Sequence, residues 1–205
     1  MFWIAFAAQI TAPQPVHWER WWSTADMPRS ILESGGSRNV ATRTTVRPNG
    51  AVLRCEVERP SGDANLDRIT CAIIAKRGKF VPARDTSGTP TYGVYRQTMT
   101  WAVIPVGEKA DSVIVADLDL SVRNLPPGVK SPTIVRVMFG VDERGRPSAC
   151  VPEPTIGKTE VNPQLALVAC QQVIRSYVPA PVNDEKGLAR ASIQDAIVRF
   201  TAQIE

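Results

Sequence analysis

Residues 49–83 read NGAVLRCEVERPSGDANLDRITCAIIAKRGKFVPA, and this stretch decides the fold. The Asn-Gly pair at its start is typical of a tight turn between two antiparallel strands. In the strand that follows, apolar and charged residues alternate around Cys55, which places the cysteine on the buried face. Residues 64–76 then repeat apolar side chains at helical spacing. We expect this helix to lie on the sheet with Cys71 facing Cys55.

A strand is expected on each side of this stretch. Residues 40–46 lead into the Asn-Gly turn as one strand, and residues 92–103 follow the helix as another. The predicted order is strand–strand–helix–strand. This order gives a three-stranded antiparallel sheet with one helix packed across it, which belongs to the α+β class.

The same order of features occurs a second time, about a hundred residues later. The second copy consists of a strand at 133–141, a turn at Arg144-Gly145, a return strand with Cys150, a helix at 163–176 with Cys170, and a closing strand at 188–202. The spacings differ from those of the first copy only by loop-sized amounts, which favours a duplicated domain. We expect a first domain at 26–104, a connector with an extra strand at 105–131, and a second domain at 132–205.

Each copy carries one pair of cysteines, and the economical interpretation is one disulfide within each copy, Cys55–Cys71 and Cys150–Cys170. Closing loops of this length contributes about 3 kcal/mol each, which is a large share of a small domain's stability. Disulfides indicate an oxidising compartment, such as a periplasm or the outside of a cell. Two pairs of buried free thiols in a cytosolic protein are the alternative.

A metal or cofactor site is not expected. A zinc site would need ligands from both copies, because the chain contains one histidine and no closely spaced cysteine pair. That histidine, His17, lies outside both copies, so neither a Ser-His-Asp nor a Cys-His site is expected. Residues 85–88 (DTSG) resemble an aspartic-protease loop superficially, but their composition is that of a turn. We predict a protein without enzymatic activity.

The start of the chain allows more than one interpretation. Residues 1–12 (MFWIAFAAQITA) are similar to the apolar part of a secretory signal, but they lack a basic leading region and offer poor cleavage positions. A misassigned start codon and a packed first strand are the alternatives. Residues 13–25 hold three of the five tryptophans and are expected to cover the first domain as a lid, with a binding face as the alternative. The chain has no apolar run of about eighteen residues, so no membrane span is expected.

The charge pattern bears on the partner. The net charge of +4 comes from dispersed basic residues with acidic residues interleaved, whereas nucleic-acid binders concentrate Lys and Arg on one stripe. The longest basic cluster, residues 76–79, is placed at the end of the first predicted helix. We therefore expect no nucleic-acid partner.

In combination these features resemble the C-terminal domain of TonB, the energy transducer of outer-membrane transport in Gram-negative bacteria. The resemblance rests, in chain order, on Met27-Pro28, Gly35-Gly36, Pro48-Asn49-Gly50, Ser61-Gly62, Leu66-Asp67, Phe80-Val81-Pro82-Ala83 and Trp101. It covers residues 27–103 well and residues 132–202 less well, because Glu153-Pro154-Thr155-Ile156-Gly157 replaces the Ser-Gly step in the second copy. A full transducer also has a membrane anchor and a Pro-rich spacer, and these 205 residues show no counterpart of either.

The resemblance implies a periplasmic module that binds an extended peptide or protein segment by adding it to a sheet edge, as in outer-membrane transport. The partner would be a TonB-dependent outer-membrane receptor or another envelope component. The closing strands supply the expected edge, at Tyr92, Val94, Arg96, Thr98, Thr100, Ile193, Ala196, Val198 and Phe200. The alternative is a disulfide-stabilised structural protein of the envelope whose two copies pair internally, which would leave no edge available.

Overall fold

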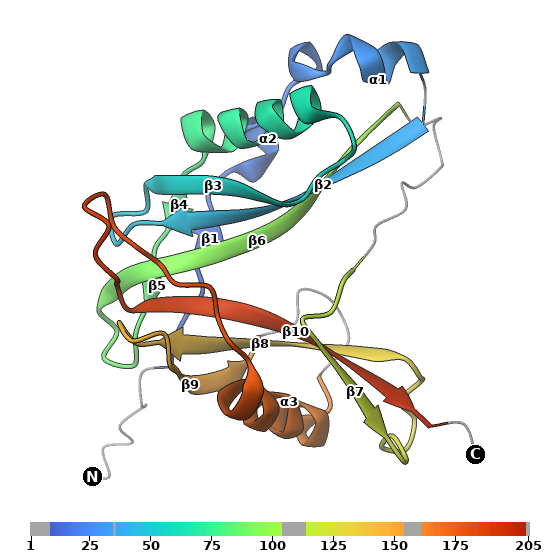
Figure 1. Cartoon of the computed structure of the whole chain (residues 1–205), viewed down its shortest axis with the longest axis vertical. Helices are drawn as coiled ribbons and strands as arrows, with labels where there is room; N and C mark the ends of the chain where they lie inside the picture. Colours follow the sequence, from blue (N-terminus) through green and yellow to red (C-terminus); the bar gives the residue numbers. More distant parts are fainter. Residues whose placement is uncertain (1–8, 35, 104–113, 154–160, 204–205) are drawn as a thin grey trace, which may run out of the picture. The chain divides into compact units, whose positions relative to one another are not determined.

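The computed structural model of the chain describes residues 9–34, 36–103, 114–153 and 161–203. It is a mixed α+β structure, as predicted, and it divides into two compact units. Unit 1 comprises residues 1–12, 83–92 and 115–205, and unit 2 comprises residues 13–82 and 93–114. Figure 1 labels the helices and strands of both units.

Unit 2 contains a three-stranded antiparallel sheet with one long helix against it. Its elements are β1 (Gln14–Pro15), the short 3-10 helices Trp18–Arg20 and Thr24–Asp26, α1 (Arg29–Ser34), β2 (Gly36–Val46), β3 (Val52–Arg59), α2 (Ala64–Arg77), β4 (Phe80–Val81) and the greater part of β6 (Pro90–Val103). Strand β2 is central, with β3 on one edge and residues 93–103 of β6 on the other. Helix α2 runs along β3 and β2 (Figure 1). Strand β1 pairs with β4 in a small separate ribbon.

Local chemistry explains where the elements of unit 2 begin and turn. At the β2–β3 turn, Gly50 has a φ of 81°, which suits glycine, and the Asn49 side chain accepts a hydrogen bond from the Ala51 N–H. Helix α2 begins after Asp63, whose carboxylate accepts hydrogen bonds from the N–H groups of Asn65 and Leu66.

Aromatic residues close the core of unit 2. The buried members of this core are Trp21, Ile31, Val40, Val46, Leu66, Ile73, Phe80 and Trp101. The ring of Trp21 packs edge-on against Phe80 at 5.2 Å between centroids, and Trp22 packs against Trp101 at 5.5 Å. Two of the three tryptophans of residues 13–25 therefore cover the unit as predicted, whereas Trp18 is exposed.

Unit 1 contains a four-stranded sheet of mixed direction. Its elements are β5 (Ala83–Arg84), the first residues of β6, β7 (Leu118–Val122), β8 (Thr133–Val141), β9 (Pro147–Pro152), α3 (Pro163–Ser176) and β10 (Ser192–Ala202). The strand order is β9-β8-β10-β7, and β7 runs parallel to β10 while the other pairs are antiparallel. Helix α3 lies against β9 and β8 (Figure 1). Its buried residues Leu165, Ala166, Ala169 and Val173 join the core of this sheet.

The two units differ from the expected domain boundaries. Residues 83–92, expected in the first domain, belong to unit 1, where β5 pairs with the first residues of β6. Residues 115–131, expected as a connector, belong to the same unit and supply β7 at 118–122. The reason is physical in both cases, because Ala83 packs in a cluster with Met138 and Ile193, and β7 forms its backbone hydrogen bonds with β10. Residues 104–113 lie outside the described residues.

The start of the chain is partly described. Residues 1–8 of the candidate signal lie outside the described residues, and the rest is packed. Ile10 is buried in a cluster with Ala83, Met138 and Ile193, and Thr11 forms an antiparallel bridge with Arg84. Residues 10–12 therefore correspond to the packed first strand, which was one of the alternatives to a secretory signal. Across the described ranges, none of the helices has the length and apolar character needed to cross a membrane.

Candidate functional site

Two disulfides connect strand and helix in the predicted pairs. Cys55 on β3 is bonded to Cys71 on α2, and Cys150 on β9 is bonded to Cys170 on α3, with Cα–Cα distances of 5.3 and 5.5 Å. Each bond therefore fixes a helix to the outermost strand beneath it. Two disulfides are characteristic of a protein that folds in an oxidising compartment.

The described residues contain no cluster of histidine, cysteine or acidic side chains that would hold a metal ion. All four cysteines are engaged in disulfides. The Asp85 carboxylate accepts hydrogen bonds from the N–H groups of Ser87 and Thr89, which is the turn geometry predicted for residues 85–88. At the basic cluster, Arg77 closes α2 by binding Asp26 through two hydrogen bonds of 2.6 and 2.9 Å.

The closing strand β10 does not offer the expected edge along its second half. Val198 pairs with Val135 of β8 on one side and with Leu118 of β7 on the other, and Phe200 lies between Thr133 and Leu120 in the same way. The prediction of an open edge is wrong at these two residues. The physical reason is that residues 118–122, a strand of unassigned partner in the sequence, pair parallel to β10.

A side-chain hydrogen bond extends this cover by one residue. The Asp117 N–H donates to the Ile197 carbonyl, and the Ile197 N–H donates to the Asp117 carboxylate, both at 2.7 Å. The four predicted β10 residues are also buried, as Ile193, Ala196, Val198 and Phe200 expose 3% of their surface or less. They are core residues rather than a recognition surface.

Strand β6 carries the other predicted edge residues, Tyr92, Val94, Arg96, Thr98 and Thr100. The last four lie on the sheet face opposite α2, since the intervening residues Tyr95, Met99 and Trp101 pack in the unit 2 core. Arg96 forms an ion pair with Glu58 at 3.0 Å, and the Thr100 hydroxyl donates to Asn39 at 2.7 Å. The role of this strand in binding a partner segment stays a prediction.

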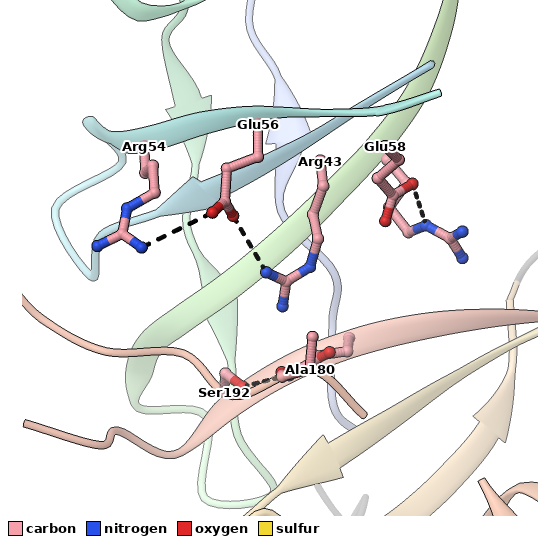
Figure 2. A network of polar contacts seen from close by, with 8 residues as sticks. Arg43, Arg54, Glu56, Glu58, Ala180 and Ser192 are labelled. Atoms are coloured by element: carbon pink, nitrogen blue, oxygen red, sulfur yellow. Dashed lines mark hydrogen bonds and ion pairs between the residues drawn. The ribbon is translucent and has the colours of Figure 1, made fainter. Parts of the chain in front are cut away.

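The face of unit 2 opposite α2 is charged. Figure 2 shows Glu56 between Arg54 and Arg43, with ion-pair distances of 3.7 and 3.4 Å. Glu58, whose carboxylate pairs with Arg96, lies on the same face. These ion pairs orient the charged side chains of β3 on the sheet face opposite α2. Within unit 1, the Gln194 amide donates to the Ala180 carbonyl and to the Ser192 hydroxyl.

Strand β3 is an end strand that the sequence did not single out. It pairs with β2 along one edge, and next to its start the described pairing on the other edge is the bridge between Ala51 and Lys79. Its solvent-facing residues Arg54, Glu56 and Glu58 are exposed. The signal available in the sequence was the hairpin itself, which identifies β2 and β3 as neighbours but does not say which of them is central.

Strand β9 is the corresponding end strand of unit 1, and it is poorly suited to accept another strand. Pro147 and Pro152 occupy its two ends and have no N–H to donate. Ala149 has a φ of 45°, and the pairing with β8 is irregular between Met138 and Gly140. Prolines are a usual protection of an exposed edge, since they cannot donate to an added strand.

A hollow of about 570 Å³ lies beside the start of α3. Its lining is mainly apolar, with Lys130, Thr133 and Asn162 as polar members. The helix terminus gives this hollow no free donors, because the Asn162 side chain already accepts from the N–H groups of Gln164 and Leu165. Pro163 has no N–H. The arrangement therefore does not provide an anion site.

One carboxyl group shows a raised pKa. Burial raises the pKa of Glu153, and Arg136, whose Nε lies 3.3 Å from the carboxylate, opposes the shift. Arg136 also lies 4.0 Å from Asp195. A guanidinium between two carboxylates is an ordinary structural ion-pair arrangement.

Comparison with protein-family models, curated proteins and solved structures gave no match to this chain. The resemblance to the TonB C-terminal domain therefore stays a proposal.

Proposed function

We propose that the chain is a periplasmic or secreted binding module that captures an extended segment of another protein by strand addition. In this proposal the chain arose from two copies of a TonB-like strand–strand–helix–strand domain, and it has no catalytic role. Its partner is an envelope protein, for which an outer-membrane receptor of the TonB-dependent class is the first candidate. The two disulfides support an oxidising location.

The observation that carries this proposal is the end strand β3. An end strand presents alternate N–H and C=O groups that an extended segment can pair with. Residues Val52–Arg59 contain no proline, in contrast to β9, and the Cys55–Cys71 bond fixes the strand to α2. A fixed strand loses little conformational entropy when a partner binds, which favours binding.

A peptide selection with a residue-level readout tests the proposal. Random 12-residue peptides are selected against the oxidised full chain, and amide exchange is measured with and without a selected peptide. At a peptide concentration about 100 times Kd, we expect alternate amides within 53–59 to exchange about a hundredfold more slowly, because binding stabilises the bound state by about 2.7 kcal/mol. The amides of β9 serve as the internal control and keep their rates.

Two outcomes would contradict strand addition at β3. One is the absence of any selected peptide. The other is a peptide that binds without protecting residues 53–59. Protection of residues 92–100 instead would move the site to β6, the strand that the sequence suggested. Such protection can be detected because successive N–H groups of a strand point to opposite edges, and only half of those of β6 point toward β2.

A second candidate function is a structural component of the envelope whose sheet edges are covered inside the chain. The cover that β7 and Asp117 give to the second half of β10 favours it. This function predicts that all amides of β6 and β10 are as strongly protected from exchange in the free chain as those of β2 and β8. The same exchange measurement therefore separates the two candidates.

A further inference from the structure

Helix α3 has an uncharged stripe on its solvent side, formed by Gln164, Leu167, Gln171 and Ile174. All four residues are exposed, and Leu167 and Ile174 expose 61% and 43% of their surface. Val178, just beyond the helix, is 87% exposed. The stripe is separate from the buried face of the helix, which packs on β8 and β9. We call these four residues the α3 stripe.

The fold does not require apolar residues at these positions, because α2 does without them. The two helices have 14 residues each, and aligning Cys71 with Cys170 aligns them from end to end. The α2 residues that correspond to the α3 stripe are Asn65, Arg68, Ala72 and Ala75. Arg68 donates a hydrogen bond to Asn65 at 2.8 Å, as expected on a solvated surface. The fold therefore does not account for an exposed leucine and isoleucine on one line of α3.

We infer that the α3 stripe is a dimer interface that packs against the α3 stripe of a second copy of this chain. Its residues are spaced alternately by three and four positions, which is the spacing that two packed helices need along their seam. A symmetric dimer requires a patch that is complementary to itself. The stripe meets this requirement, because it carries no charge and each glutamine amide both donates and accepts hydrogen bonds.

The charges on α3 fix the direction of the pair. Arg175 is the only charged residue of the helix and lies in its last turn. An antiparallel pair places the two Arg175 side chains at opposite ends, whereas a parallel pair would bring these like charges together. Antiparallel packing also sets the two helix dipoles in opposite directions, which is favourable. We therefore assign a two-fold axis perpendicular to α3.

The same charges disfavour a lipid surface as the occupant. Helices that lie in a membrane interface carry several Lys and Arg residues on the polar face, which attract anionic lipids. Helix α3 has a single cation, and its first turn has no acidic residue to repel a second copy. Two helices of 14 residues form a small interface, so the dimer is weak and depends on concentration.

Sedimentation equilibrium of the oxidised full chain tests this inference, from about 10 μM to about 1 mM, where small interfaces associate. We expect the mass to rise toward that of a dimer. The variant Leu167→Arg/Ile174→Ala, which introduces the α2 residues, should weaken association at least about tenfold, which corresponds to about 1.4 kcal/mol. The matched control is Leu32→Arg on α1, where Leu32 is 58% exposed, and it should associate like the unchanged chain.

A charge pair gives a readout that a folding defect would not produce. Gln171→Lys and Gln171→Glu should each associate weakly, and an equimolar mixture of the two should recover dimers. A chain that stays monomeric throughout the range would overturn the inference, as would a dimer that is insensitive to Leu167→Arg/Ile174→Ala. Flotation with lipid vesicles that depends on Leu167, without self-association, would also overturn it. This inference does not depend on strand addition at β3.

Discussion

Replacing Gly50 with alanine should destabilise the chain far more than the same change at Gly145. Both glycines occupy the turn between two paired strands, and both have a positive φ, 81° and 77°. A Cβ atom built at Gly50 lies 2.1 Å from the carbonyl oxygen of Phe80, whereas one built at Gly145 has no neighbour within 4 Å. Both changes therefore carry the cost of a positive φ at alanine, and only Gly50→Ala adds a steric overlap.

The magnitudes follow from these contacts. The left-handed conformation costs an alanine about 1–2 kcal/mol, which is the full expectation for Gly145→Ala. At Gly50 the overlap must be relieved by moving β4, which breaks the hydrogen bond from the Phe80 N–H to the Gly50 carbonyl and shifts the buried Phe80 ring from Trp21. A lost buried hydrogen bond and a disturbed core each cost about 1–3 kcal/mol. We expect a total of about 3–8 kcal/mol for Gly50→Ala.

Amide exchange in the central strand of each unit measures the loss of stability of that unit separately. Residues 40–46 of β2 report on unit 2, and residues 133–141 of β8 report on unit 1, in the oxidised chain under native conditions. Gly50→Ala should lower protection in β2 by at least about 2 kcal/mol more than Gly145→Ala lowers protection in β8. Equal losses in the two strands would refute the reasoning, because they would mean that the approach of Gly50 to Phe80 has no energetic consequence.

Two further predictions concern bonds that close unit 2. Cys55→Ala and Cys71→Ala should each lower the free energy of unfolding by about 3 kcal/mol, and the double variant should lose little more. Denaturant unfolding followed by tryptophan fluorescence measures these losses. Additive losses would argue against a bond between the two cysteines. Arg77 and hydrogen bonds from Ser23 lower the pKa of Asp26 to about 2, so Asp26→Asn should destabilise at pH 7, and the difference should shrink as pH falls from about 4 to about 2. A difference that persisted unchanged at pH 2 would mean that the carboxylate charge is not involved.

Several elements of this fold could be predicted because the sequence specifies them locally. Helix α3 has the predicted bounds, and α2 extends one residue beyond them. Proline at the first helical position of α3 and the capping Asp63 before α2 are visible in the sequence itself. The two disulfides could be predicted for a related reason, since the two-residue period of a strand places Cys55 on the face that the helix covers.

The state of the strand edges could not be predicted, because it depends on contacts that are distant in the sequence. The pairing of β7 with β10 joins residues 118–122 to residues 198–202, and a parallel pair has no turn sequence that would announce it. Residues 83–84 and 90–91 form a local antiparallel hairpin, but Ala83 packs against Met138 and Ile193, which are distant in the sequence. The burial of Val198 and Phe200 follows from β7, so the error in the predicted edge has a single cause.

The comparison of α2 with α3 shows which positions are constrained by the fold and which are available for function. The inward positions are similar in both helices, since Leu66 corresponds to Leu165, Ile74 corresponds to Val173, and Cys71 and Cys170 both reach the end strand beneath. The outward positions are not equivalent, since Arg68 corresponds to Leu167. Solvent-facing residues contribute little to stability, so they are free to change when a partner surface is required. The differences between the two units on their outer surfaces are therefore where selection for binding would leave its trace, at the β3 edge in one unit and at the α3 stripe in the other.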